Sequence, residues 1–344
     1  PKAGERRRPP AQRTGECALN EHKDQAFPRA HPLLLGVDGG GTKTLAVVAT
    51  IDADGAPREL GRGRSGPSNI RLAGSDLALA SLGASISAAL ADAGLADERI
   101  DSAVLALAGA SGPDIRTQLD QWIGSFPALT RVRIIPDTEP VLAEGTPDGW
   151  GIALLIGTGS VASGLDATGR SLVKGGWGHW FGDRGSGYDL GRQALAAAAE
   201  MDDGYGPETT LLASLKEHFE ISNLRHVVQW LATSDNVRKQ VAAATPAVMA
   251  AAEAGDEVAL RILSNGVGEL SRITQAVANG LGFKDGYPLA MAGSVICHNV
   301  IYRELLLPAL LSDHPCPGPI EFVSEPMRGC LDLALRELRK HNGN

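Results

Sequence analysis

The stretch LLLGVDGGGTKTLAVVATID, Leu33 to Asp52, decides the fold. Two runs of aliphatic and β-branched residues, Leu33 to Val37 and Thr44 to Ile51, are typical of strands. Between them lies a segment rich in glycine and threonine, and Asp38 closes the first run. The stretch therefore predicts a strand pair joined by a turn with few side chains, beside a carboxylate.

This turn has the composition of an anion-binding loop. Glycine has no Cβ and can adopt positive φ, so backbone N–H groups can approach phosphate oxygens closely. The predicted phosphate contacts are Gly39, Gly40, Gly41, Thr42, Lys43 and Thr44. The loop is not a Walker A motif, because its lysine follows a threonine and it joins two strands. It also lacks the GxGxxG pattern of a dinucleotide-binding turn.

A carboxylate beside a phosphate loop is useful when a cation lies between them. Mg²⁺ binds one or two carboxylates together with phosphate oxygens and keeps several waters, so Asp38 is a predicted magnesium-organising residue. The alternative is that Asp38 caps the turn. A second loop with the same donors, Gly157-Thr158-Gly159-Ser160, favours magnesium. Two such loops facing one cleft can bind a nucleoside triphosphate.

The second loop belongs to a second copy of the opening pattern. GIALLIGTGSVASGLDATGRSLV, Gly151 to Val173, again contains an apolar strand, a Gly/Thr/Ser turn and a second strand. The Asp-Ala-x-Gly turn at Asp52–Gly55 is matched at Asp166–Gly169. Any β-hairpin has glycine at its turn, but the repeated Asp-Ala-x-Gly turn favours two related lobes. A chain of 344 residues is long enough for both.

Strands and helices alternate along the rest of the chain. Further strands are predicted at 58–62, 102–108, 131–135 and 320–323, and a strand with its turn at 288–295. Helices are predicted at 75–93, from Pro113, at 186–201, 207–219, 224–233, 237–254, 256–281 and 299–311, and after Pro326. This alternation predicts an α/β protein with helix-covered sheets. We expect a flexible tail over 1–32, an N-terminal domain over 33–145 onto which the last helix, 327–341, packs back, and a C-terminal domain over 146–326.

The composition excludes several classes of function. With 43% hydrophobic and 21% charged residues the chain is typical of a globular protein, and no apolar run approaches the ~20 residues of a membrane span. A formal net charge of -8 argues against non-specific nucleic-acid binding. We therefore expect a small-molecule partner, with no nucleic acid and no membrane.

The four cysteines, Cys17, Cys297, Cys316 and Cys330, are scattered without a CxxC pair. That spacing favours reduced thiols and a cytoplasmic location. A metal site could be assembled from Cys297, His298, His314 and Cys316, but no zinc-type spacing supports it. A buried cysteine commonly behaves as a small hydrophobic residue.

Asp137 is the candidate catalytic base. It follows the strand predicted at 131–135, and a kinase needs a group that orients the attacking hydroxyl and accepts its proton. Aspartate is also favoured at the N-cap of a helix. The residues alone support the two interpretations equally.

The densest glycine cluster is KGGWGHWFGDRGSGYDLG, Lys174 to Gly191. It is too rich in glycine for a helix interior and too distinctive for a linker. In one interpretation it is a rigid turn against a sugar, with Asp183 accepting hydroxyl protons. In the other, its glycines allow tight packing and Trp177 and Trp180 anchor the core. For His179 a structural, hydrogen-bonded role is favoured over catalysis.

Together these motifs resemble the sugar kinase/Hsp70/actin superfamily, and within it N-acetylglucosamine kinase and its relatives in the BadF-type ATPase family. The resemblance is carried, in family order, by GVDGGGTKT at Gly36, GPSN at Gly66, PDTEPVLAEG at Pro136, IGTGS at Ile156, GGWGHWFGDRGSGYDLG at Gly175 and AGSV at Ala292. It implies a two-lobed actin-like (ribonuclease H-like) ATPase fold. Each lobe is then a mixed sheet flanked by helices, with a nucleotide cleft between the lobes.

The resemblance also implies roles for individual residues. The two glycine loops bind the ATP phosphates, Asp38 organises Mg²⁺ through water, and Asp137 takes the proton of the sugar hydroxyl. Gly293 and Ser294 lie near adenosine. The implied sugar contacts are Asn69, Asp137, Thr158, Gly176, Trp177, Asp183 and Gly187. Arg184 departs from the family, whose members often carry glutamate there, and this leaves the preferred sugar open.

The implied activity is ATP-dependent phosphorylation of the 6-hydroxyl of an amino sugar, N-acetylglucosamine first and glucosamine as the alternative, by a magnesium-dependent homodimer. The alternative from another class is a BadF-type ATPase activator that phosphorylates no sugar. Such activators bridge a dimer with an iron–sulfur cluster held by paired cysteines. The scattered cysteines argue against this alternative.

Overall fold

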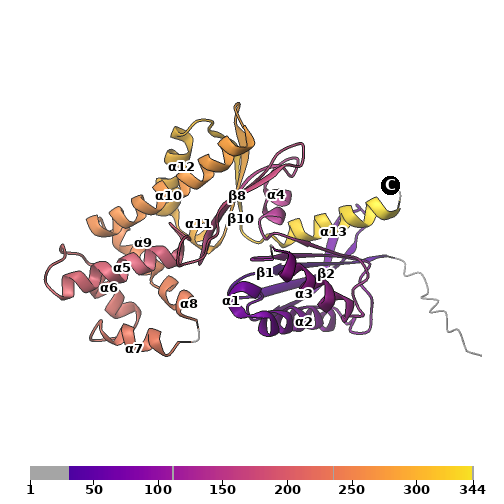
Figure 1. Cartoon of the computed structure of the whole chain (residues 1–344), viewed down its shortest axis with the longest axis horizontal. Helices are drawn as coiled ribbons and strands as arrows, with labels where there is room; N and C mark the ends of the chain where they lie inside the picture. The colour runs from indigo at the N-terminus through magenta and orange to yellow at the C-terminus, as the bar shows by residue number, and fades with distance from the viewer. Residues whose placement is uncertain (1–30, 111, 235, 343–344) are drawn as a thin grey trace, which may run out of the picture. The chain divides into compact units, whose positions relative to one another are not determined.

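The computed structural model describes residues 31–110, 112–234 and 236–342 (Figure 1). Within it the chain from Pro32 onward forms one compact unit. The tail predicted over 1–32 lies outside the described residues except for its last two positions.

The first sheet has five strands in the order β3-β2-β1-β4-β5. They are β1 (Leu33–Gly39), β2 (Thr44–Ile51), β3 (Pro57–Ser65), β4 (Ser102–Leu107) and β5 (Val132–Ile135). Strands β1, β2 and β3 pair antiparallel, whereas β4 and β5 continue the sheet parallel to β1. The carboxyl ends of β1, β4 and β5 therefore meet at one edge.

The second sheet repeats this topology. Its strands are β6 (Gly151–Ile156), β7 (Ser160–Leu165), β8 (Ser171–Gly175), β9 (Tyr287–Ala292) and β10 (Pro317–Val323), in the order β10-β9-β6-β7-β8. Strands β6, β7 and β8 pair antiparallel, and β9 and β10 lie parallel to β6. The internal repeat predicted from the two Gly/Thr turns is confirmed at the level of topology.

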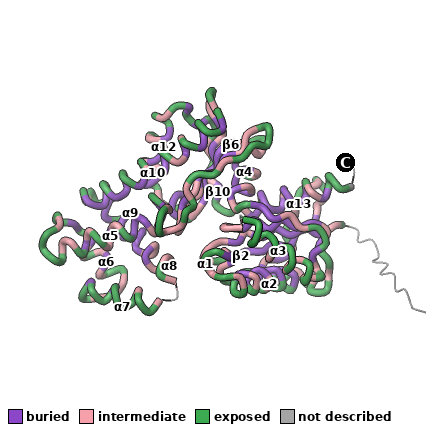
Figure 2. Tube along the Cα trace, viewed as in Figure 1, coloured by how far each residue is buried: buried purple, intermediate pink, exposed green. Residues whose placement is uncertain are grey.

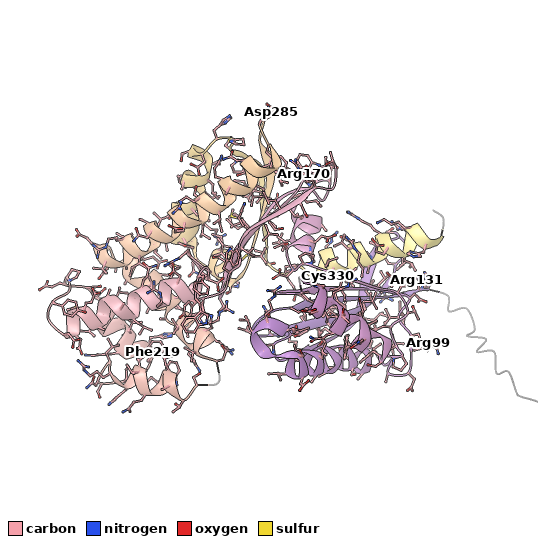
Figure 3. The ribbon with its side chains drawn as sticks, viewed as in Figure 1. Arg99, Arg131, Arg170, Phe219, Asp285 and Cys330 are labelled. Atoms are coloured by element: carbon pink, nitrogen blue, oxygen red, sulfur yellow. The ribbon has the colours of Figure 1, made fainter. Side chains whose placement is uncertain are left out.

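Helices cover both faces of the first sheet. They are α1 (Ile70–Ala73), α2 (Ser75–Asp92), α3 (Pro113–Gly124) and α13 (Met327–Asn342). Successive side chains of a strand point to opposite faces: Leu35 and Val37 pack with residues of α2, whereas Leu34 packs with residues of α13. Cys330 on α13 is buried against this sheet, with its Sγ atom 3.8 Å from the Val37 carbonyl oxygen (Figure 3).

The second sheet is covered in the same way. Its helices are α5 (Gly187–Asp202), α6 (Leu211–His218), α7 (His226–Ala232), α8 (Val237–Ala242), α9 (Thr245–Glu253), α10 (Glu257–Leu281), α11 (Ser294–His298) and α12 (Val300–Ser312). Ile152 and Leu154 of β6 belong to the large core formed with these helices, whereas Ala153 packs with residues of α4 (Glu139–Gly145). The central strands of both sheets are buried along their length (Figure 2).

The predicted α/β fold of two helix-flanked mixed sheets is confirmed, and most predicted elements occur within one or two residues of their expected bounds. The prediction of a single helix over 237–254 is wrong, because the chain forms two helices there, α8 and α9. Pro246 lies in the first turn of α9, where its missing N–H costs nothing, and proline disfavours a helical residue before it. The domain bounds at 145 and 146 stay a prediction.

Candidate active site

The first sheet brings two carboxylates together. Asp38 lies at the end of β1 and Asp137 follows β5, so the parallel pairing through β4 places both at the same edge. Burial raises the pKa of Asp38, the nearby Lys43 ammonium lowers it, and Glu325 raises it further. The two carboxylates interact electrostatically, because the charge of Asp38 contributes to the pKa of Asp137.

Asp137 has the pKa expected of a base that works near neutral pH. Burial, followed by the negative charge of Asp38, raises the pKa of Asp137 to about 6. The N-cap position of α4 is occupied by Thr138, so the helix-capping interpretation of Asp137 is not supported. Groups whose pKa is displaced towards the working pH are characteristic of general acids and bases.

The first glycine loop is tied to the segment that carries Asn69. Gly40 donates its N–H to the Lys43 carbonyl oxygen at 3.0 Å, and its own carbonyl oxygen accepts from the N–H groups of Ser68 and Asn69 at 3.0 and 3.1 Å. Thr44 is fully buried and its hydroxyl donates to the Gly66 carbonyl oxygen at 2.7 Å. In this structure the Thr44 hydroxyl thus serves the fold, and its phosphate contact stays a prediction.

The second glycine loop is tied to the start of α5. Gly157 donates its N–H to the Gly159 carbonyl oxygen at 2.9 Å, and its own carbonyl oxygen accepts from the Gly187 N–H at 2.8 Å. The Thr158 carbonyl oxygen accepts from the Tyr188 N–H at 3.2 Å. Gly187 therefore holds the loop with its backbone, while its predicted sugar contact remains untested.

The predicted adenosine residues adjoin this loop. Gly293 has a φ of 107°, and a methyl group added there would lie 2.5 Å from the Ile156 carbonyl oxygen. Only glycine fits so close to another backbone at that φ. As a result Ser294 lies next to Gly157: a methyl group added at Gly157 would be 3.9 Å from the Ser294 nitrogen.

Asp183 is buried and held by two partners. It is 4% exposed and adopts a φ of 55°. Its Oδ1 atom accepts from the Ser160 N–H at 3.2 Å, and its Oδ2 atom pairs with Arg238 Nη2 at 2.8 Å. Arg184, the residue that departs from the family pattern, lies 3.5 Å from the carboxylate of Asp189. Arg184 thus forms an ion pair with the first turn of α5.

The aromatic residues of this turn do not anchor the core. Trp177 and Trp180 are 76% and 79% exposed, so the core-anchor interpretation is wrong for both. The His179 ring packs near Trp180 and Tyr188, with ring centroids 4.7 and 5.2 Å away. Its buried Nδ1 atom has no hydrogen-bond partner among the described residues. Burial and Arg238 lower the pKa of His179, while Asp183 raises it.

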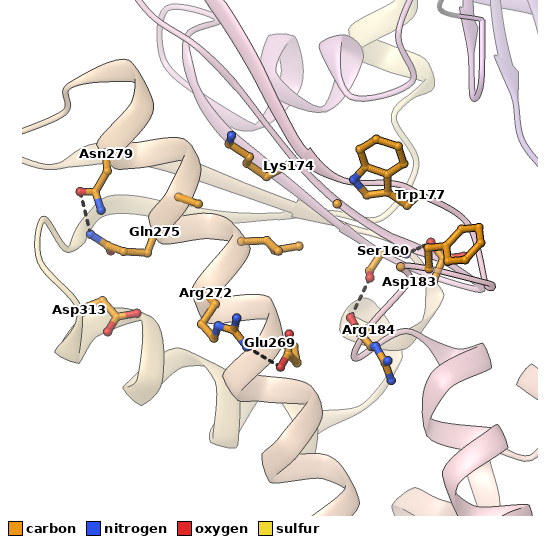
Figure 4. A pocket seen from close by; sticks show the side chains of 15 residues that line it. Ser160, Lys174, Trp177, Asp183, Arg184, Glu269, Arg272, Gln275, Asn279 and Asp313 are labelled. Atoms are coloured by element: carbon orange, nitrogen blue, oxygen red, sulfur yellow. Dashed lines mark hydrogen bonds and ion pairs between the residues drawn. The ribbon is translucent and has the colours of Figure 1, made fainter.

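A pocket of about 630 Å³ opens beside this turn (Figure 4). Its lining includes Ser160, Lys174, Gly175, Trp177, Phe181, Asp183, Arg184, Glu269, Arg272, Gln275, Asn279 and Asp313. Trp177 and Asp183, two predicted sugar contacts, contribute to it, whereas Asn69 and Asp137 do not. The pocket therefore adjoins the second glycine loop and is separate from the pair of carboxylates on the first sheet.

Sequence reasoning missed Arg238. This residue of α8 pairs with Asp183 and lies beside both glycine loops, since methyl groups added at Gly159 and Gly41 would be 2.7 and 3.5 Å from its guanidinium nitrogens. One guanidinium thus connects the two loops that the sequence predicts to face each other. A single arginine in a helix without a motif carries no local signal of this position.

Asp38 fits the requirements of a magnesium ion. Mg²⁺ uses one or two protein carboxylates and takes its other ligands from phosphates and water, and Asp38 offers one such carboxylate beside the first loop. Across the described ranges no group of three or more His, Cys, Asp or Glu side chains could hold a metal ion. No helix in those ranges is long and apolar enough to cross a membrane.

Comparison with known proteins gives consistent matches. The sequence model of the BadF/BadG/BcrA/BcrD ATPase family matches residues 35–309. The chain is 31% identical over 273 residues, 79% of its length and 88% of the relative, to N-acetylmuramic acid/N-acetylglucosamine kinase of Clostridium acetobutylicum. It is 27% identical over 315 residues, 88% of its length and 98% of the relative, to N-acetyl-D-glucosamine kinase of Dictyostelium discoideum.

Solved structures agree with these matches. A proposed N-acetylglucosamine kinase of Chromobacterium violaceum superposes with a TM-score of 0.69 at 26% identity, covering 88% of this chain and 99% of that one. A glucokinase of Streptomyces griseus, solved with glucose and AMPPNP, has a TM-score of 0.50 at 17% identity, covering 88% of this chain and 99% of that one. The second likeness concerns the fold alone.

Proposed function

The chain belongs to the BadF/BadG/BcrA/BcrD ATPase family, and from this premise we propose that it transfers the γ-phosphoryl group of ATP to the 6-hydroxyl of an amino sugar, N-acetylglucosamine. The observation that carries the proposal is the placement of Asp137 beside Asp38, at the edge where the parallel strands β1, β4 and β5 end. Its raised pKa, about 6, suits a proton acceptor near neutral pH. The 31% identity to a kinase of N-acetylmuramic acid and N-acetylglucosamine supports this substrate class.

In this proposal Asp137 acts on the acceptor sugar. The ionised carboxylate accepts a hydrogen bond from the 6-hydroxyl, which orients the oxygen towards the γ-phosphorus. The O–P bond to the sugar forms as the bond to ADP breaks, and the hydroxyl proton passes to Asp137. Because phosphoryl transfer depends mainly on positioning and charge stabilisation, correct placement of this oxygen is the main task of the residue.

The glycine loops act on the nucleotide. Gly40, Gly157 and Ser160 donate their N–H groups within the fold, so in this proposal the other N–H groups of Gly39–Thr44 and Gly157–Ser160 donate to phosphate oxygens, which the glycines allow to approach closely. Mg²⁺, when bound, would neutralise charge on the β- and γ-phosphate oxygens. Asp38 would hold that ion through water, and Gly293 and Ser294 would flank adenosine next to Gly157.

Unsatisfied polar atoms support the proposed sugar contacts. The Oδ1 atom of Asn69 and the Oγ atom of Ser68 are buried without hydrogen-bond partners in the described part of the chain. Buried polar atoms are almost always hydrogen-bonded to protein, ordered water or a ligand, so these two atoms are available to a bound sugar. Asn69 Oδ1 is an acceptor suited to a sugar hydroxyl. We also keep Thr158, Gly176, Trp177 and Asp183 as proposed sugar contacts.

Among the described residues, the activator alternative finds no support in the cysteines. Cys330 on α13 is fully buried, Cys297 on α11 is partly buried, and Cys316 is exposed in the segment before β10. An activator would need accessible, paired cysteines to share a cluster with a second subunit. Reduced cysteines, a cytoplasmic location and a homodimer remain parts of our proposal.

The test is a coupled assay of ADP release by the purified protein with hexoses, glucosamine, N-acetylglucosamine and N-acetylmuramic acid. We expect turnover with N-acetylglucosamine and a product whose ³¹P–¹H coupling places phosphate on carbon 6. Preference for glucosamine would change the substrate but not the reaction. ATP hydrolysis without sugar dependence, or iron in the purified protein, would reject the kinase and favour the activator.

A further inference from the structure

Arg238 lies where the two proposed phosphate loops come closest. A methyl group added at Gly159 would be 2.7 Å from its Nη2 atom, and one added at Gly41 would be 3.5 Å from its Nη1 atom. Gly41 follows a strand of the first sheet and Gly159 a strand of the second. The guanidinium therefore faces both loops, at the place where the phosphates of a nucleotide would lie.

This guanidinium keeps a hydrogen-bond donor without an acceptor among the described residues. Nη2 pairs with Asp183 Oδ2 at 2.8 Å, but the buried Nε atom has no acceptor among the described residues. The Arg238 side chain is only 17% exposed and that of Asp183 only 4%. A buried donor without a partner destabilises the folded protein. An arginine that keeps such a donor beside two anion-binding loops is suited to an anionic ligand.

The chemistry of the Arg238 guanidinium favours a phosphate group as the anionic ligand. A guanidinium is planar, permanently charged and able to donate two parallel hydrogen bonds to one phosphate group. The loops themselves supply neutral N–H donors, and Lys43, the charged residue of the first loop, is exposed and acts on Asp38. Arg238 can therefore supply a buried positive charge at the junction of the loops.

The position of Arg238 beside Asp183 indicates which phosphate of the nucleotide it would bind. Asp183 and Trp177, two of the proposed sugar contacts, line the same pocket. Arg238 pairs with the Asp183 carboxylate and faces both loops, and the phosphate nearest the sugar is the one that is transferred. We propose that Arg238 binds the terminal phosphate of the nucleotide and that Asp183 orients its guanidinium, a role that rests on the proposed function.

During transfer Arg238 forms no covalent bond. The bond from the γ-phosphorus to the leaving oxygen of ADP breaks, the bond to the sugar oxygen forms, and the hydroxyl proton goes to Asp137. The guanidinium donates to the non-bridging oxygens throughout and stabilises the charge spread over them. A side chain that only neutralises the buried Asp183 would instead affect stability and sugar binding.

The experiment measures AMPPNP and ADP binding by titration calorimetry with Mg²⁺, comparing Arg238→Gln with the unaltered protein. We expect AMPPNP affinity to fall about 10- to 100-fold, the size of a charged hydrogen bond. ADP, which lacks the terminal phosphate, should change by less than about 2-fold. The matched control is Lys239→Gln, which removes an exposed charge from the same helix and should leave both affinities unchanged.

Equal losses for AMPPNP and ADP, or no loss for either, would overturn the proposal. So would a loss confined to sugar affinity. If Arg238→Gln fails to fold, Arg238→Lys keeps the charge without the planar geometry and should still weaken AMPPNP selectively. The ratio of the two affinities requires no turnover. Absence of sugar phosphorylation in the unaltered protein would therefore reject the kinase without deciding the role of Arg238.

Discussion

The strand pairs β1–β2 and β6–β7 have one architecture and different chemistry. In both, a buried strand runs into a glycine turn and returns antiparallel, and in both the first strand has a parallel neighbour. Asp38 in β1 and Leu155 in β6 occupy equivalent positions, each one residue before the last paired residue of its strand. Leu155 packs with the core around α4, whereas Asp38 interacts with Asp137.

The two halves thus share one backbone topology, and they differ in the charged residues that each contributes to the site. The first half contributes the carboxylates Asp38 and Asp137, which suit a cation and a proton acceptor. The second half contributes the ion pair of Asp183 and Arg238, which brings a positive charge to the loops. A site that must bind a metal, a polyphosphate and a hydroxyl needs charges of both signs.

The largest expected effect comes from removing the proposed base of the first half. Asp137→Asn should lower kcat by about 10²- to 10⁴-fold, while the affinity for sugar measured by calorimetry changes by less than about 2-fold. The exposed Asp148→Asn is the matched control. Activity close to that of the control would contradict the assignment of Asp137.

The loop glycines should differ in their tolerance of a methyl group. Gly39→Ala would place Cβ 2.3 Å from Ser68 Oγ, and Gly159→Ala would place it 2.7 Å from Arg238 Nη2, whereas Gly40→Ala meets nothing closer than 3.5 Å. We expect losses of about 1–3 kcal/mol in unfolding free energy for the first substitution, as is usual for overpacking. Urea unfolding measures them.

Within the same set, Gly159→Ala should weaken AMPPNP binding as well, because it displaces the guanidinium. Gly40→Ala should be the mildest of the three in stability. A ranking in which Gly40→Ala costs more than Gly39→Ala would show that the loop adopts another packing.

The pH dependence should reveal the interaction between the two carboxylates. Asp137 must be ionised to accept a proton, and its pKa of about 6 lies above the usual range, so kcat/KM should fall as the pH drops through 6. Because the charge of Asp38 helps to raise that pKa, Asp38→Asn should move the acidic limb to lower pH, besides weakening magnesium dependence. An acidic limb that stays in place would argue that the two groups do not interact.

The smallest expected effects separate the two threonines of the first loop. Thr42→Val should raise the KM for ATP about 2- to 10-fold, the size of one neutral hydrogen bond. Thr44→Val removes the bond to the Gly66 carbonyl oxygen and should lower the unfolding free energy by about 0.5–1.5 kcal/mol. If Thr44→Val weakened ATP binding more than Thr42→Val, the predicted phosphate contact of Thr44 would stand after all.

Much of this protein was predictable from short windows of sequence. Alternating apolar residues and glycine turns indicated the strand pairs, and aspartates at strand ends indicated where a carboxylate site would form. The motif order around Gly36, Pro136 and Ile156 indicated the family. These features are local, because strand and turn propensities act over a few residues.

Contacts between distant segments were decided only by the tertiary structure. It brought Arg238 of α8 to Asp183 and to both loops, placed Gly293 against the Ile156 carbonyl, and left Trp177 and Trp180 exposed where the sequence also allowed a core role. Each of these depends on how sheets and helices that are distant in the sequence pack together. One sequence determines the elements and their turn chemistry, but which side chains meet is a property of the packed chain.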